Sequence, residues 1–216
     1  MTYQRSSDGF GDGRDQPIGV LLLHGWRSRR PVGHWHHWLA ASLEERGHQV
    51  AYPQLPDPDE PQLDAWVEAA SVALGSLTAP SRIVLCHSLG CLTWLHLAER
   101  NRGEVLVDRL ALVAPPGSRM VSSTPEISGF AFKARRSSAL GAREARLVYS
   151  DDDPYCPEVA DVVYGKLRNL DRDLLPGQAH LDMDAGYGSW PSLLDWCVDE
   201  RTRISSRLAE LAASIA

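Results

Sequence analysis

The sequence predicts an α/β fold with a mostly parallel sheet of about six strands flanked by helices. Short apolar runs alternate with amphipathic segments along the chain of 216 residues. The runs lack the polar-apolar alternation of half-exposed strands, which is typical of parallel strands buried on both faces. No internal repeat or domain linker interrupts this order. We therefore expect a flexible leader over 1–17 and a single α/β domain over 18–216.

The first half of the chain begins with a strand over 18–23, a continuous apolar run that ends in His-Gly. Residues 33–47 have apolar side chains at helical spacing and end in glycine, which predicts a helix. A short strand is expected within 48–56. Residues 57–77 then carry an apolar helical stripe, and Asp59 is the expected N-cap of that helix.

The second half of the chain repeats this order. An apolar strand over 83–86 leads directly into a helix over 89–99. Three further strands are expected, within 107–117, 145–155 and 170–180. The Ser-rich segment 118–144 is too short for a full lid domain and forms at most a small flap. Helices are expected over 157–169 and over 191–216, the second of them broken near Arg203.

Composition and charge argue against several classes of function. A net charge of −6 disfavours nucleic acid or an anionic membrane surface as the main partner. No apolar run approaches the roughly 20 residues that span a bilayer, and the N-terminus lacks the apolar region of a secretory signal. The four cysteines form no C-x-x-C pair. A cytoplasmic protein without cofactor or metal is therefore expected.

The segment "CHSLG" joins the third expected strand to its helix. A turn of the type G-x-S-x-G exposes its serine at the carboxyl edge of such a sheet, so Ser88 is the candidate nucleophile. Its alternative role is a helix N-cap. Gly90 supplies one of the two small residues that the turn needs, and Cys86 stands where glycine is usual. The N–H of Leu89 is one expected oxyanion donor.

The segment "LLLHGW" ends the first strand with His24 and Gly25. A His-Gly pair at this point lets the backbone approach the serine, with an ordinary turn as the alternative. The N–H of Trp26 is then the second expected oxyanion donor. His24 and Gly25 are candidate pocket residues on the same ground, and His24 is also expected to help shape the oxyanion loop.

The segment "YSDDDPY" ends the fifth strand with three acids. A serine nucleophile with a histidine base needs one carboxylate to orient the imidazole. Asp153 is favoured because the following Pro154 gives it extended geometry, and Asp152 is the second choice. The alternative is a solvated turn with capping acids.

His180 follows the sixth strand, 27 residues after Asp153, and is the candidate base. The resulting chain order of Ser, Asp and His is the order of α/β-hydrolases. Among the eight histidines, position selects this one. His87, beside Ser88, is expected to line the rim or to be structural, and Trp190 is a further pocket candidate. Two histidines of the first helix lack the acid or cysteine that would complete a metal site.

The combination of these segments resembles the small, lidless serine hydrolases related to retinoblastoma-binding protein 9. The matching stretches run from about Ile18 to Trp196 and include "LLLHGW", "GHWHHW", "CHSLGCL", "YSDDDPYC" and "AHLDMDAGYGSWP". The resemblance implies an α/β-hydrolase fold and assigns Ser88 as nucleophile, Asp153 as acid and His180 as base. Two departures stand out, Cys86 for the first elbow glycine and Ala179 for the glycine that usually precedes the histidine.

The expected activity is carboxylesterase-like hydrolysis of a small acyl ester through an acyl-enzyme on Ser88. Amide, peptide or thioester hydrolysis by the same residues is an alternative within enzymes. A non-catalytic module that binds a protein partner on a hydrolase fold is the alternative outside them. The sequence leaves the physiological substrate and the oligomeric state open.

Overall fold

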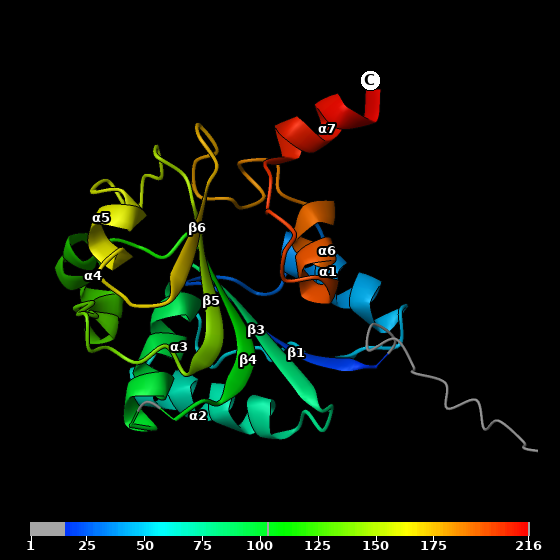
Figure 1. Cartoon of the computed structure of the whole chain (residues 1–216). Coiled ribbons are helices and arrows are strands. Elements are labelled where there is room, and N and C mark those ends of the chain that lie inside the picture. The colour runs from blue at the N-terminus through cyan, green and yellow to red at the C-terminus, as the bar shows by residue number, and fades with distance from the viewer. Residues whose placement is uncertain (1–15, 103, 216) are drawn as a thin grey trace, which may run out of the picture.

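A single six-stranded parallel sheet forms the centre of the computed structural model, which describes residues 16–102 and 104–215 (Figure 1). Its strands lie in the order β2-β1-β3-β4-β5-β6, and every neighbouring pair is parallel. The strands are β1 (Ile18–Leu23), β2 (Gln49–Ala51), β3 (Ser81–His87), β4 (Val107–Val113), β5 (Ala142–Tyr149) and β6 (Leu170–Leu174). The expected strand number and direction are confirmed. Most of the expected leader, residues 1–15, lies outside the described residues.

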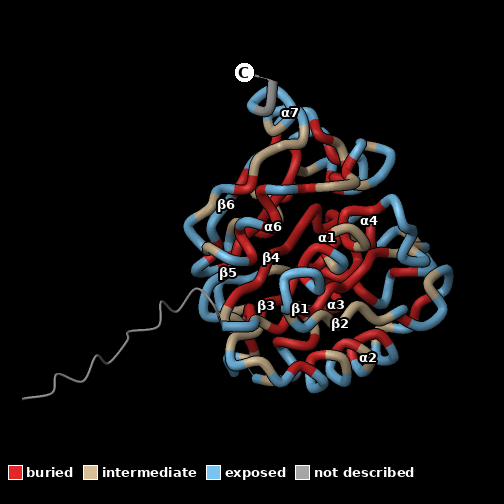
Figure 2. The backbone as a smooth tube through the Cα atoms, turned by 90° about the vertical axis from the view of Figure 1, so that its right-hand side faces the viewer, coloured by how far each residue is buried: buried red, intermediate tan, exposed pale blue. Residues whose placement is uncertain are grey.

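Helices cover both faces of the sheet. Alternate strand residues point to opposite faces, and each face has its own apolar core. One core holds Leu21, Val84 and Leu110 beneath α2 (Leu63–Gly75), α3 (Leu89–Arg100) and α5 (Ala160–Tyr164). The other holds Val20, Ile83 and Ala111 beneath α1 (Trp35–Glu44) and α6 (Pro191–Val198). Figure 2 shows buried backbone through the middle of the molecule and exposed backbone around it.

The helix α2 begins later than expected. Its N-cap is Gln62, whose side chain makes no capping hydrogen bond, rather than Asp59. Asp59 instead forms an ion pair with Arg29, and its carbonyl accepts a hydrogen bond from the Trp26 indole at 2.9 Å. The expected cap was wrong because this carboxylate serves the loop that follows β1.

The segment 118–144 contains a short helix α4 (Ser118–Ser123) and a 3₁₀ turn (Pro125–Phe130) before β5 begins. These two pieces pack against the first core through Val121, Ile127 and Phe130. The closing helix is broken as expected, into α6 and α7 (Arg207–Ile215).

An ion pair joins β5, β6 and the segment between α6 and α7. Arg146 Nη1 lies 3.2 Å from Asp173 Oδ2, and both side chains are buried. Arg146 also donates to the carbonyls of Thr202 and Glu200, and Asp173 accepts from the Ile204 N–H. The C-terminal segment is thereby attached to the edge of the sheet.

Candidate active site

Ser88 occupies the sharp turn between β3 and α3. Its backbone is left-handed, with φ of 53° and ψ of −124°, which is an unfavourable conformation for a residue with a side chain. The turn also needs close backbone approach on both sides. A Cβ on Gly90 would lie 2.5 Å from the Leu23 carbonyl oxygen, and one on Gly25 would lie 2.7 Å from Ser88 Cβ. Glycine is therefore required at both positions.

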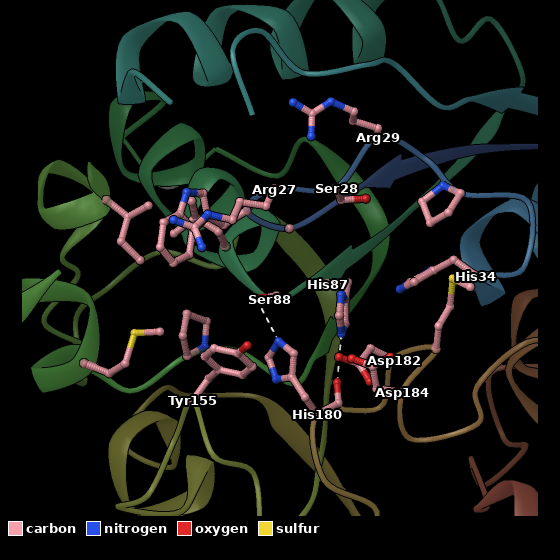
Figure 3. A pocket seen from close by; sticks show the side chains of 18 residues that line it. Arg27, Ser28, Arg29, His34, His87, Ser88, Tyr155, His180, Asp182 and Asp184 are labelled. Atoms are coloured by element: carbon pink, nitrogen blue, oxygen red, sulfur yellow. Dashed lines mark hydrogen bonds between the residues drawn. The ribbon is translucent and has the colours of Figure 1, made fainter. Parts of the chain in front are cut away.

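Ser88, His180 and Asp153 form one continuous hydrogen-bonded chain (Figure 3 shows the first two). The Ser88 hydroxyl lies 2.9 Å from His180 Nε2. On the other side of the ring, His180 Nδ1 lies 2.9 and 3.0 Å from the two oxygens of Asp153. With the proton on Nδ1, the ring donates to the carboxylate and accepts from the serine. Such an arrangement can draw the proton from Ser88 when Oγ attacks a carbonyl.

The acids next to Asp153 have different contacts. Asp152 Oδ1 accepts from the Ala179 N–H at 2.8 Å, and Asp151 Oδ1 accepts from the Gly177 N–H at 2.9 Å. The side chain of His180 is thus paired with Asp153, which is itself 4% exposed. The structure therefore pairs His180 with Asp153, the favoured acid, and not with Asp152.

A cavity of about 500 Å³ opens beside Ser88 and His180 (Figure 3). Four further residues singled out in the sequence line it: Gly25, Trp26, His87 and Leu89. Leu89 is the first residue of α3, so its N–H has no partner within the helix. The two backbone groups expected as oxyanion donors therefore belong to residues that border the same cavity as the serine.

His24 and Trp190 do not line this cavity, and the expectation that they are pocket residues was wrong. His24 is fully buried, donates from Nδ1 to the Gly25 carbonyl and accepts at Nε2 from the Leu55 N–H. Burial lowers its pKa to about 4. This imidazole holds the loop that follows β1 through hydrogen bonds to the backbone, and it does not face the cavity.

Trp190 is fully buried in the second core, where it packs edge-to-face against Trp35 and Tyr187. Its indole N–H donates to the Ser205 carbonyl at 2.8 Å. The ring joins the loop after His180 to the C-terminal segment, and its polar atom is already used there.

Several residues that the sequence analysis did not single out line the cavity. Tyr155 lies against the His180 ring, with centroids 4.4 Å apart. Met120 and Ile127 come from the segment 118–144, which therefore forms one wall. Polar side chains also line the cavity, among them Ser28, His34, Asp182 and Asp184 (Figure 3). Tyr155 could have been found from its position, because it follows Asp153 by two residues. No local sequence pattern indicates that the other wall residues line a cavity.

Thiols and metal ligands do not offer a rival centre in the part of the chain that the structure describes. Cys86 and Cys91 are buried, and burial raises the pKa of both thiols well above the usual value. Both side chains belong to the apolar core beneath α2 and α3. No group of three or more His, Cys, Asp or Glu among the described residues is placed to hold a metal ion. Nor is any described helix long and apolar enough to cross a membrane.

The parallel sheet, the serine turn after β3 and the histidine after β6 define an α/β-hydrolase fold. The family model described as "Serine hydrolase" matches residues 20–197, and the chain belongs to that family. YdeN of Bacillus subtilis (strain 168), which is named as a hydrolase, is 31% identical over 102 residues. That match covers 44% of this chain, and the chain spans about half the length of that relative, 53%.

Solved structures share the fold at lower sequence identity. The crystal structure of the B. subtilis YdeN product superposes with a TM-score of 0.70 at 21% identity, covering 83% of this chain and 96% of the other. A YdeN-like protein from Pectobacterium atrosepticum gives 0.64 at 20% identity, covering 86% and 91%. Est1E from Butyrivibrio proteoclasticus gives 0.58 at 15% identity, covering 87% and 86%. The relation to retinoblastoma-binding protein 9 stays a prediction.

Proposed function

We propose that this serine hydrolase cleaves small acyl esters through an acyl-enzyme intermediate on Ser88. The observation that carries the proposal is the chain of hydrogen bonds from Ser88 Oγ through His180 to Asp153, beside an open cavity. A serine that acts only as a helix cap would not need a buried histidine and carboxylate in line with it. Membership in the family supports hydrolysis and leaves the bond type open.

The reaction follows from these contacts. His180 Nε2 takes the Ser88 proton as Oγ attacks the ester carbonyl carbon, and Asp153 stabilises the imidazolium that forms. The N–H groups of Trp26 and Leu89 are the proposed oxyanion donors. The imidazolium then protonates the leaving alcohol. Water, deprotonated by the same ring, attacks the acyl carbon, and the acid leaves as Ser88 regains its proton.

The walls of the cavity support a small substrate with an apolar part. Met120, Ile127 and Tyr155 form an apolar side, and a space of about 500 Å³ suits a short acyl group better than a long lipid chain. Thioesters and amides react by the same steps, so substrates that differ only in the scissile bond are needed to rank the three.

The test is labelling with a fluorophosphonate probe, located by peptide mass spectrometry, in wild type and in His180→Ala. We expect Ser88 to be modified in wild type and largely unmodified in the variant. Turnover of matched ester, thioester and amide substrates with the same acyl group then ranks the three bonds. An unlabelled, folded wild type would contradict the proposal and favour a partner-binding module on the same fold.

A further inference from the structure

The loop that carries His180 is strained on both sides of the histidine. Ala179 and Leu181 are both left-handed, with φ of 45° and 53°, although neither is glycine. Such residues persist where the surrounding structure holds them in place. The question is therefore which contacts hold this loop, because they also determine where the imidazole lies.

The end of β5 holds the loop from one side. Three consecutive residues just before Asp153 each accept a hydrogen bond from a loop N–H, over 2.8 to 2.9 Å: Asp151 from Gly177, Ser150 from Gln178, and Asp152 from Ala179. The hydrogen bonds from Ser150 and Ala179 lower the pKa of the Asp152 carboxyl. Asp152 therefore remains an ionised acceptor for the residue next to the histidine.

The end of β3 and the start of α1 hold the loop from the other side. His87 Nε2 donates to the carbonyl of His180 itself at 2.9 Å. Trp35 Nε1 donates to the next carbonyl, that of Leu181, at 3.0 Å. His87 is 5% exposed, and its ring lies 4.9 Å from the His180 ring and 5.2 Å from His34.

The His87 imidazole is suited to this contact because burial lowers its pKa well below the usual value. A neutral ring does not repel the imidazolium that His180 forms during the reaction. Its Nε2–H is fixed as the donor because its partner is a carbonyl. Since His87 directly precedes Ser88, the same residue joins the nucleophile turn to the backbone of the base.

We propose that His87 and Asp152 are positioning residues that clamp the His180 loop from opposite sides and keep Nε2 within hydrogen-bonding distance of Ser88. The clamp rests on the proposed function, since positioning has a consequence only if His180 acts as the base. It assigns a purpose to Asp152, the neighbour of Asp153 that does not contact the imidazole, and to the histidine beside the nucleophile.

Two pairs of variants test the clamp. His87→Phe keeps a ring but removes the donor, and His87→Gln keeps an N–H₂ donor. Asp152→Ala removes the acceptor, and Asp152→Asn keeps one oxygen. With 4-nitrophenyl acetate, we expect kcat to fall about 10- to 100-fold in the first member of each pair, with KM little changed, because small misplacements of catalytic groups have effects of this size. The second member should recover most of kcat.

His36→Phe is the matched control. His36 is as deeply buried in the same ring cluster, 5.0 Å from His34 and 6.0 Å from His87, and it touches Trp35, but among the described residues no hydrogen bond joins its side chain to the His180 loop. Its kcat should equal that of wild type. An equal loss in His36→Phe and His87→Phe would overturn the clamp in favour of general packing.

A crystal structure of His87→Phe tests the clamp without reference to turnover. Separation of His180 Nε2 from Ser88 Oγ beyond hydrogen-bonding distance, or a displaced loop, supports it; an unchanged separation of 2.9 Å overturns it. An inactive wild type together with a displaced His180 in the variant would refute the proposed function and retain the clamp. An active wild type, with kcat and the position of His180 unchanged in the variants, would retain the proposed function and refute the clamp.

Discussion

Single residues determine the geometry at Ser88, and two glycines make its left-handed turn possible. Gly90 lets α3 start against the carbonyls of Leu23 and His24, and Gly25 lets the loop after β1 pass the serine side chain. Cys86, in place of the usual glycine, is fully buried, and its carbonyl accepts from the Cys91 thiol at 3.3 Å. The turn therefore tolerates a small side chain on the strand side.

Substitution of Gly25 by alanine should strongly slow the labelling of Ser88 without unfolding the protein. The new Cβ would lie 2.7 Å from Ser88 Cβ and 3.2 Å from Oγ, so the nucleophile must shift. We expect the fluorophosphonate labelling rate to fall by about 100-fold or more. Gly75→Ala is the control, because nothing lies within 4 Å of its Cβ position. Equal labelling of the two variants would show that the close approach is unimportant.

Asp153→Asn should lower kcat by about 10⁴, because the amide no longer selects the tautomer with the proton on Nδ1. The relevant contacts are those of His180 Nδ1 with both Asp153 oxygens. Asp152→Asn should lower kcat far less. The check is the steady-state kcat for hydrolysis of an ester by both variants, with circular dichroism to verify folding. The reverse ranking would assign the acid to Asp152.

The positions of site residues were predictable where the order of the sheet defines them and not where packing does. Ser88, Asp153 and His180 each end or follow a strand, so the parallel order alone placed them at one edge. His24 and Trp190 also lie in loops at that edge, yet both rings point into the protein and bond to Leu55 and to Ser205. Which way a ring points depends on neighbours distant in the sequence, and no local pattern encodes it.

Elements at the β5–β6 edge depend on a buried charge pair. Asp173→Ala would leave the Arg146 guanidinium buried without its carboxylate partner, and the Ile204 N–H would lose its acceptor. Removing one member of a buried pair typically costs about 3–5 kcal/mol, so the midpoint of urea unfolding should fall sharply. Arg201→Ala removes an exposed pair with Asp199 and should leave the midpoint unchanged. Similar midpoints for the two variants would refute the structural importance of the buried pair.

The central strands were predictable because burial on both faces makes them largely apolar runs, as in β1 and β3. The first residues of helices were harder to predict. Asp59 has the composition of an N-cap, but its tertiary contacts with Arg29 and Trp26 outweigh that preference, and α2 begins at Leu63. The order within 118–144 was also missed, because its short helices are stabilised by contacts of Val121 and Phe130 with the core rather than by their own periodicity.

The molecule as a whole keeps several imidazoles neutral by burying them on either side of the Ser88 turn. Burial lowers the pKa of His24 and of His34 to about 4, and lowers the pKa of His36 and His87 well below the usual value of 6.5. In the unfolded chain these groups take up protons near pH 6.5. The unfolded state therefore binds more protons than the folded state below that pH.

Stability should consequently fall as the pH is lowered from about 6.5 toward 4, and should be fully retained above 6.5 with respect to these groups. Each buried imidazole contributes at most about 1.4 kcal/mol per pH unit within that window. The measurement is the free energy of urea unfolding at intervals between pH 7.5 and 5, above the range where most carboxylates titrate. His36→Phe removes one such group, so its stability should vary less steeply with pH than that of wild type. Equal slopes for the two proteins would mean that His36 takes up its proton as readily in the folded state as in the unfolded chain.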